Sequence, residues 1–575
     1  MHSIKPQCHN LCCAALLAGA LASSATAVLA QAAPDAGRLL QEIERSAAPP
    51  PRPEPRAIEL PGGEAPLPDS GVRVLVRGFR IQGASVFSEA ELQALLHDFV
   101  GQALNFPQLQ SATAVIARHY RAKGFLARAL LPRQTIAQGL VDITVIEGRL
   151  GEVSVAAAPA LPRLEPEVAR RMLLAQQASG ALLRPDAVQY GLRLINELPG
   201  IQASASLLAG TEAGTSNVLL DVLEAPLFSG QVMLDNAGAL STGKERLLAS
   251  LLLNDPSGQG DQLSLMGLTA SGTQFVRAGY QLRAGYSGLR VGVQASNLRY
   301  AVGAPLQNLD ANGSADVLGL SLAYPLVRSN SLELDLNAST ETKSLVNNAN
   351  HSNTSHKALE VYTLGINASR QDALWGGGKN QWAANVVVGR LHLDANVADA
   401  ASDLLGARTQ GDFSKLTYSA ARLQGLGARL GLNLALSGQM ADHNLDSSEQ
   451  FTLGGPTGVR AFALSEASGD EGWLLSSELR YQWSSSTQFQ AFVDTGGVRL
   501  HHALWSGWDA ARSGQPNGYQ LAGLGFGFSY SKPGDFTIKG SVAWRLGDNP
   551  GTADNRDSDG TRESPRLWVQ FSKTI

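Results

Sequence analysis

The sequence predicts a mainly β protein, in which a sixteen-stranded antiparallel transmembrane β-barrel follows two small α/β units and an N-terminal helix. Three observations over residues 226–575 predict the barrel: apolar and polar residues alternate, the strands are even in number, and the connections are short and long in turn. In residues 331–338, for example, leucine and alanine alternate with glutamate, aspartate and asparagine. This pattern indicates one face toward lipid and one toward a polar lumen, and a lumen of sixteen strands is wide enough to conduct.

The connections also predict the direction of the barrel. Short connections such as residues 531–534 alternate with long ones such as residues 439–471. Outer-membrane barrels have short periplasmic turns and long extracellular loops, so we expect the N-terminal units in the periplasm. The strands are predicted to begin near residues 228, 244, 260, 273, 287, 314, 330, 356, 379, 412, 427, 472, 486, 518, 535 and 564.

Composition and the N-terminal segment exclude other classes of protein. The formal net charge of −4 gives no basis for binding nucleic acid. Residues 1–30 combine a basic start with an apolar stretch and a small residue at the end, which is typical of a secretory signal peptide. All three cysteines, at positions 8, 12 and 13, lie within it, so the mature chain is predicted to lack thiols and disulfides. No later apolar run is long enough for a transmembrane helix, which leaves a closed barrel as the way to span a membrane.

Residues 31–47 are predicted to form a short amphipathic helix with Leu39, Leu40 and Ile43 on its apolar face. Residues 48–71 form a proline-rich linker that favours an extended polyproline II conformation. Because so short a helix is marginally stable alone, we expect it to dock elsewhere on the protein. The alternative is an N-terminus that frays and has no fixed position.

Two α/β units follow, at residues 72–156 and 157–225. The first is predicted to contain a strand at 74–82, a helix opened by a capping box at Ser88 and Glu91 that runs to Phe99, a helix at 107–124, and two more strands. The second repeats this order, with helices at 165–177 and 185–197. Two helices on one face of a small sheet leave a sheet edge free for an extended peptide, although a simple spacer domain has the same secondary structure.

Three stretches resemble one known family. The first unit carries the segments 79–87, 119–125, 131–134, 139–143 and 145–149, the second carries Asn196-Glu-Leu-Pro-Gly200, and a long barrel loop carries Gly454-Gly-Pro-Thr-Gly-Val-Arg-Ala-Phe462. These resemble the outer-membrane transporters of two-partner secretion (TpsB proteins of the haemolysin secretion/activation type) within the Omp85 superfamily. The two units resemble the POTRA (polypeptide-transport-associated) domains of that family, and the resemblance covers nearly the whole mature chain.

The resemblance implies a loop that folds back into the pore. The Val-Arg-Gly-aromatic motif of the family is matched by Val459, Arg460, Ala461 and Phe462, and its Phe-x-Asp-x-Gly motif on the thirteenth strand by Phe492, Asp494 and Gly496. Strand parity separately places Phe492 and Asp494 toward the lumen. We therefore expect a bidentate pair between Arg460 and Asp494 that fixes the loop, called here the pore-loop lock; the alternative is two ordinary lumenal charges.

The chain departs from the family pattern at two positions. Ala461 stands where the family has glycine, so the backbone there must tolerate a methyl group. The last residue is Ile575, where the family commonly has an aromatic residue, while Phe571 shares its lipid-facing parity. Contact with the barrel-assembly machinery during biogenesis is therefore expected to differ from the family pattern.

The resemblance implies a translocator in the outer membrane of a Gram-negative bacterium. Its periplasmic POTRA domains would capture a large secreted exoprotein of the TpsA type, haemolysin-like or adhesin-like, which would pass unfolded through the barrel to the cell surface without ATP. The N-terminal helix would plug the resting pore, and the chain would be a monomer surrounded by outer-membrane lipid. Partner contact is expected at apolar and aromatic residues of the first unit: Leu92, Leu95, Leu96, Phe99, Tyr120 and Phe125.

Three other functions compete with this one. An assembly or insertion factor of the same superfamily remains the alternative, although two POTRA domains rather than three or more argue against it. A diffusion porin would have no use for these domains. An enzyme would need a nucleophile, a base and an orienting group close together, and the sequence shows no motif of that kind and no phosphate-binding loop. No catalytic residue, cofactor or metal is therefore expected.

Overall fold

The computed structural model describes residues 35–46, 72–157, 162–510, 514–552 and 554–575. The predicted signal peptide at 1–30 and the predicted linker at 48–71 lie outside the described residues. Of the predicted plug helix at 31–47, the structure describes residues 35–46. None of the described helices is long and apolar enough to cross a membrane.

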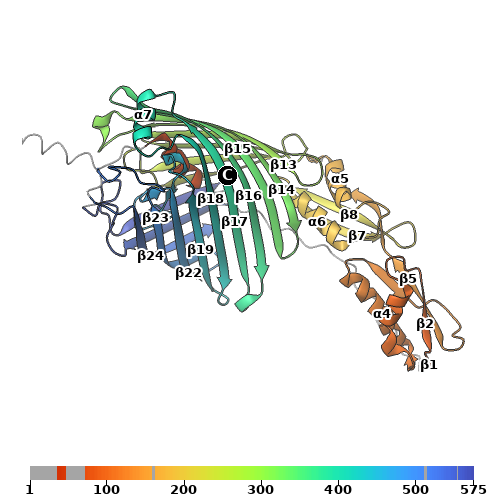
Figure 1. The fold of residues 1–575 in the computed structure, drawn as a ribbon. Helices are drawn as coiled ribbons and strands as arrows, with labels where there is room; N and C mark the ends of the chain where they lie inside the picture. The colour runs from red at the N-terminus through yellow and green to blue at the C-terminus, as the bar shows by residue number, and fades with distance from the viewer. Residues whose placement is uncertain (1–34, 47–71, 158–161, 511–513, 553) are drawn as a thin grey trace, which may run out of the picture.

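Sixteen strands form one closed antiparallel barrel (Figure 1). Each barrel strand pairs with the barrel strands that precede and follow it in the chain, and the last strand, β26, pairs with the first, β9. The predicted fold class is confirmed. The largest error in a predicted strand start is at β16, which was expected near 356 and begins at Ser352. The barrel strands are β9 Phe228–Asp235, β10 Arg246–Asn254, β11 Gln262–Ala270, β12 Thr273–Arg283, β13 Arg290–Ala301, β14 Asn312–Arg328, β15 Leu332–Ala349, β16 Ser352–Asp372, β17 Gly378–His392, β18 Gly411–Gly425, β19 Leu430–Ala441, β22 Glu471–Gln482, β23 Thr487–Arg499, β24 Gly518–Lys532, β25 Phe536–Arg545 and β26 Arg566–Thr574.

The outer surface of the barrel is apolar, as a lipid-facing wall requires. On β14 the leucines at 318, 320 and 322 are exposed while the residues between them face inward. Aromatic side chains gather near the periplasmic ends of the last strands, where Trp483 lies edge-on to Phe489 and Phe536 stacks on Phe571 at 6.0 Å. Outer-membrane barrels have girdles of aromatic residues at both membrane–water interfaces, so this belt marks the periplasmic side of the wall.

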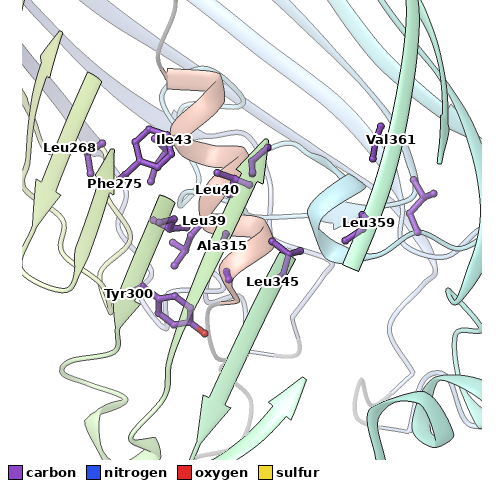
Figure 2. Packing of buried hydrophobic residues seen from close by; sticks show 14 of the residues in the cluster. Leu39, Leu40, Ile43, Leu268, Phe275, Tyr300, Ala315, Leu345, Leu359 and Val361 are labelled. Carbon is purple, nitrogen blue, oxygen red and sulfur yellow. The ribbon is translucent and has the colours of Figure 1, made fainter. Parts of the chain in front are cut away.

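The interior differs from the uniformly polar lumen that the sequence predicts. Inward-facing residues of neighbouring strands, among them Phe275, Leu298 and Leu345, form a buried apolar cluster inside the barrel. The described part of the N-terminal helix, α2 (Ala36–Ser46), packs its own apolar face on this cluster (Figure 2). Apolar side chains on an inner wall are stable only when another apolar surface covers them, and α2 provides that surface.

The first α/β domain contains β1 Arg73–Leu75, β2 Gly78–Gln82, α3 Glu89–Ala94, a 3₁₀ turn His97–Phe99, β3 Ala103–Asn105, α4 Phe106–Ala122, β4 Ala127–Leu130 and β5 Leu140–Glu147, with the sheet order β2-β5-β4. The single strand predicted at 74–82 is divided into β1 and β2. The strand divides because its two halves have different partners: β1 pairs with β3, and β2 pairs with β5. Between them, the Arg77 backbone N–H donates a hydrogen bond to the Gly139 carbonyl.

Helix capping in this domain also differs from the prediction. Ser88 accepts a hydrogen bond from the Glu91 backbone N–H, so half of the expected capping box is present. The Glu91 carboxylate lies 3.3 Å from His119. A reciprocal capping box instead opens α4, where Asn105 and Gln108 exchange bonds. Both arrangements satisfy N–H groups that a helix start leaves open.

The second α/β domain contains β6 Arg149–Val155, α5 Pro166–Gln176, α6 Pro185–Asn196, β7 Ile201–Ala209 and β8 Thr215–Glu224, with the sheet order β6-β8-β7. Each domain has its own buried apolar core. Only Gly148 separates β5 from β6. Backbone hydrogen bonds from the Leu126 N–H to the Leu183 carbonyl and from the Leu183 N–H to the Gly148 carbonyl join the two domains. The pair forms an arm that extends from one end of the barrel (Figure 1).

Candidate functional site

A long loop fills part of the barrel interior. It joins β19 to β22 across residues 442–470, contains the short hairpin β20 (Phe451–Thr452) and β21 (Ser468–Gly469), and is called here the pore loop. Val459, Ala461 and Phe462 are fully buried, in one apolar cluster with residues of the barrel wall. The tip of the pore loop is therefore packed against the wall as a core segment rather than as a solvated loop.

The structure brings Arg460 and Asp494 together. The Arg460 Nε donates to Asp494 Oδ2 and its Nη2 donates to Oδ1, both at 2.7 Å, in a bidentate pair. The Arg460 backbone N–H adds a third bond to the same carboxylate at 3.2 Å. Asp494 has no exposed surface, so the pair is shielded from water and is correspondingly strong and geometrically specific.

Further groups complete the surroundings of the guanidinium. Its Nη1 donates to Glu478 at 2.8 Å, and the ring of Phe492 lies 3.4 Å from Cζ, in a cation–π contact. The indole N–H of Trp568 donates to the Arg460 carbonyl at 2.8 Å. Glu478 and Trp568 were not predicted as partners. Parity places Glu478 toward the lumen, but only the register, in which Glu478 is opposite Phe492, shows that it reaches Arg460.

Two small residues allow this close packing. A side chain at Gly496 would come within 2.4 Å of Leu453 of the pore loop, so only glycine leaves room there. The departure at Ala461 is accommodated in the same way. Its methyl group lies 2.6 Å from the position that a Cβ at Gly523 would take, and Gly523 has none. The methyl group of Ala461 on the pore loop therefore occupies the space left by the absent side chain of Gly523 on the wall.

The first half of the pore loop is held by lysines of the wall. Lys343 and Lys415 each lie 2.8 Å from the Glu449 carboxylate, and Lys357 lies 2.6 Å from Asp446. Burial alone would raise the pKa of Glu449, but the two lysines beside it lower that pKa to about 2. Glu449 is therefore ionised at neutral pH.

Helix α2 packs on the same part of the pore loop. Gly37 approaches so closely that an added Cβ would lie 2.6 Å from the Ser448 Cβ, and Gln41 donates to the Gln450 carbonyl at 2.8 Å. On the wall side, the Ala36 N–H donates to Asn347 and Glu44 pairs with Arg277. Leu39, Leu40 and Ile43 are buried in the lumenal cluster (Figure 2). The helix predicted to dock thus lies inside the barrel, between the wall and the pore loop.

Comparison with known proteins agrees with this architecture. A family model described as haemolysin secretion/activation protein ShlB/FhaC/HecB matches residues 214–530, more than half of the chain. The chain belongs to this family. It is an outer-membrane transporter whose two α/β domains lie in the periplasm, and a model of the ShlB-type POTRA domain matches residues 74–148. The α/β domains are called POTRA 1 and POTRA 2 from here on.

Individual relatives cover most of the chain. The heme/hemopexin transporter protein HuxB of Haemophilus influenzae is 29% identical over 499 residues, which is 84% of each chain. The outer membrane transporter CdiB of Dickeya dadantii is 26% identical over 455 residues, 75% of this chain and 79% of that one. The structure of CdiB from Escherichia coli has the same fold, with a TM-score of 0.67, 22% identity and coverage of 93% and 95%. These relatives are transporters, which favours transport over membrane-protein assembly.

The structure does not support all six predicted partner-binding residues of POTRA 1. Leu92, Leu96 and Tyr120 have no exposed surface and form the core of the domain, so a partner cannot contact them while the domain is folded. The prediction is wrong for these three because the apolar face of a helix covers its own sheet first. Leu95, Phe99 and Phe125 are partly buried at the edge of that core and remain candidates.

Proposed function

We propose that this transporter captures its exoprotein as an added β-strand on a POTRA sheet and passes it, unfolded and without ATP, through the barrel. The observation that carries this proposal is the content of the lumen. A wall of sixteen strands encloses a helix and a loop that belong to the chain itself and that no barrel strand needs for its pairing. Both segments can leave without opening the barrel, and their departure would make a path.

The segments that occupy the lumen are held by polar and charged contacts as well as by apolar packing. Arg460, Glu449 and Asp446 bind the pore loop to the wall, and α2 contributes only four buried side chains that exceed glycine in size. Ion pairs can be exchanged for water as the lumen hydrates, unlike an extensive apolar interface. We propose that α2 closes the resting pore and that the Arg460–Asp494 pair holds the pore loop in place.

Strand β7 of POTRA 2 is the best candidate edge for capture. Among the described residues it pairs only with β8, whereas the start of β6 is covered by residues 180–182. The Asn196 side chain both donates to the Ala203 carbonyl and accepts from its N–H, each at 2.9 Å. It thus pairs with β7 as the backbone of an added strand would, and the edge beyond it is open to an extended peptide.

Calorimetry with residues 72–225 tests this proposal. The fragment contains both POTRA cores and the backbone bonds that join them, so it is expected to fold. It should bind the unfolded N-terminal domain of the exoprotein in the micromolar range, about −8 kcal/mol, because ordering the segment consumes part of the interaction energy. The folded form of that domain should bind much less well. Equal affinity for the two forms would exclude strand addition.

The exoprotein for this test is identified among the products of the genes next to that of the transporter. A large secreted β-helical protein encoded there is the expected partner, and deleting the transporter should keep it out of the medium. Secretion that continues without the transporter would contradict the proposed function itself, whatever the calorimetry shows.

A further inference from the structure

The motif Asn196-Glu-Leu-Pro-Gly200 lies where POTRA 2 meets the barrel. Helix α6 ends in this motif, and three periplasmic turns, at residues 255–261, 284–289 and 329–331, contact the helix or the motif. Leu198 packs against Gly260, and a Cβ at Gly200 would lie 2.8 Å from the Asn254 Cβ. Leu194 of the same helix would lie 2.9 Å from a Cβ at Gly288. Backbones approach this closely only where glycine removes the side chain, so the joint is closely packed.

Glu197 is the charged centre of this joint. Its carboxylate accepts a hydrogen bond from Arg290 at 3.0 Å and contacts the guanidinium of Arg328 through both oxygens. Arg328 also donates to Asp335 at 2.5 Å, and its side chain is only 4% exposed. Two arginines of the barrel wall thus share two carboxylates, one from the wall and one from POTRA 2. Without Glu197, two largely buried positive charges would lose one of the carboxylates that balance them.

A bulge in β14 directs Arg328 toward POTRA 2. Before the bulge, Pro325 pairs with Asp335, and after it Val327 pairs with Leu334, so Leu326 is the extra residue. With regular pairing, Arg328 would have the parity of Leu322 and Tyr324, which face lipid. The bulge shifts that parity by one and turns the guanidinium away from lipid. A β-bulge interrupts the regular pairing of two strands, and it can redirect the side chains that follow it.

Polar contacts extend the joint along α6. The Tyr190 hydroxyl donates to the Pro325 carbonyl at 2.7 Å, and Arg193 donates to Asn330 at 2.7 Å. Gln189 contacts the same Asn330 side chain. These groups lie on successive turns of the helix and reach the end of β14 and the β14–β15 turn, so α6 contacts the barrel rim at several points.

We propose that Glu197 is a positioning residue that docks POTRA 2 on the periplasmic rim of the barrel, with Arg290 and Arg328 as its receptors. Docking holds the β7 edge in a fixed place beside the pore. The role in transport rests on the proposed function, but the docking itself does not, because it involves only residues of this chain. The two can therefore be tested apart.

Cross-linking in membranes without any exoprotein tests the docking. Because the only cysteines lie within residues 1–30, cysteines placed at Gln189 and Asn330 are the reactive pair in the mature chain. A short thiol-specific cross-linker should join them rapidly in the parent. Glu197→Gln should slow the reaction at least tenfold, Arg328→Gln should act in the same direction, and the double variant should be no slower than the worse single one. Glu197→Asp should fall between the parent and Glu197→Gln.

Glu333→Gln is the matched control. Glu333 is another carboxylate at this joint, but its side chain is 49% exposed and lies 3.9 Å from Arg193, so its loss should leave the rate within twofold. An unchanged rate in Glu197→Gln would overturn the proposal. If Glu197→Gln fails to assemble, the comparison of Arg328→Gln with Glu333→Gln decides in the same way.

Secretion is measured separately in the same strains. Glu197→Gln should reduce it, and slowed cross-linking with undiminished secretion would overturn the positioning role. If the parent secretes no exoprotein, the proposed function fails while a slowed cross-link still supports the docking.

Discussion

Replacing Arg460 with alanine should release the pore loop, and the structure sets the order of effects among related variants. Arg460→Ala leaves Asp494 fully buried, and only the Ser476 hydroxyl and the backbone N–H of residue 460 in the lock still donate to its carboxylate. Asp494→Ala is milder, because Arg460 keeps its bond to Glu478. Glu478 in turn keeps Arg480 when Arg460 is lost. Arg460 is therefore the member whose removal leaves the larger unpaired charge.

The expected magnitude follows from burial. Breaking a buried ion pair by removing one partner costs about 3–5 kcal/mol. At the lower end this is a factor of roughly 150 in the ratio of detached to attached loops. Asp494→Ala should cost about 1.5–3 kcal/mol, the value of hydrogen bonds to a charged group. The double variant should resemble Arg460→Ala, because the second change removes an interaction that the first has already broken.

A thiol at the loop tip measures this ratio. Val459 is fully buried, so a Val459→Cys background should react slowly with a maleimide and about a hundredfold faster once Arg460→Ala frees the loop. Arg480→Ala is the control, since Arg480 is 31% exposed and contacts Glu478 from the side, and it should change the rate less than about threefold. Secretion should fall in Arg460→Ala, in Asp494→Ala and in the double variant. Unchanged labelling, or additive effects of the two substitutions, would refute the lock.

Three further outcomes are expected. Deleting residues 34–47 should raise single-channel conductance in planar bilayers and leave secretion intact, because a helix about 10–12 Å wide leaves the lumen; unchanged conductance would show that the helix does not close the pore. Gly37→Val should act in the same direction, since its side chain collides with Ser448 of the pore loop, and wild-type conductance would argue against that contact. In POTRA 1, burial raises the pKa of Glu147, but hydrogen bonds from Ser85, Val86 and Tyr120 outweigh it and lower the pKa overall. The pKa of Glu147 is then lower in the folded than in the unfolded state, so its contribution to stability is present above about pH 4.3 and is lost as the pH falls through the folded pKa. Glu147→Gln should therefore flatten the decline in the melting temperature of the POTRA fragment at acid pH. An equally steep decline in this variant would contradict the role of Glu147.

The strand pattern could be predicted because the membrane enforces it. Every barrel strand must turn one face to lipid, so alternation reveals the strands even when each is short, and the loop lengths give their direction. Some inward-facing residues are apolar because helix α2 covers them. The sequence alone did not show which residues these are. Phe275 and Leu298 follow the lumenal parity, and only the position of α2 shows why they are not polar.

The sequence predicted which face of its strand each residue of the site lies on, but not which residues of neighbouring strands lie opposite one another. Arg460 and Asp494 could be paired because a motif and a strand face agreed. Glu478 could not, since the offset between β22 and β23 is set by their turn and by packing rather than by either strand alone. The apolar residues in and just after α3 were misleading in the opposite way. Leu92 and Leu96 suggest a binding surface when the helix is considered alone, and become core once its sheet is in place.

The join between β9 and β26 ties the barrel to the order in which its chain is made. Five residue pairs, from Gln570 with Asp235 to Thr574 with Gln231, close the wall, and the Asn236 side chain adds bonds to Leu567 and Val569. Asn236 and Leu567 are 331 residues apart, so β9 emerges from the ribosome long before its partner exists. Until β26 pairs with it, the edge of β9 is open and could pair with another chain. Premature termination just before β26 would leave that edge without its partner permanently, and the wall could not close in this way.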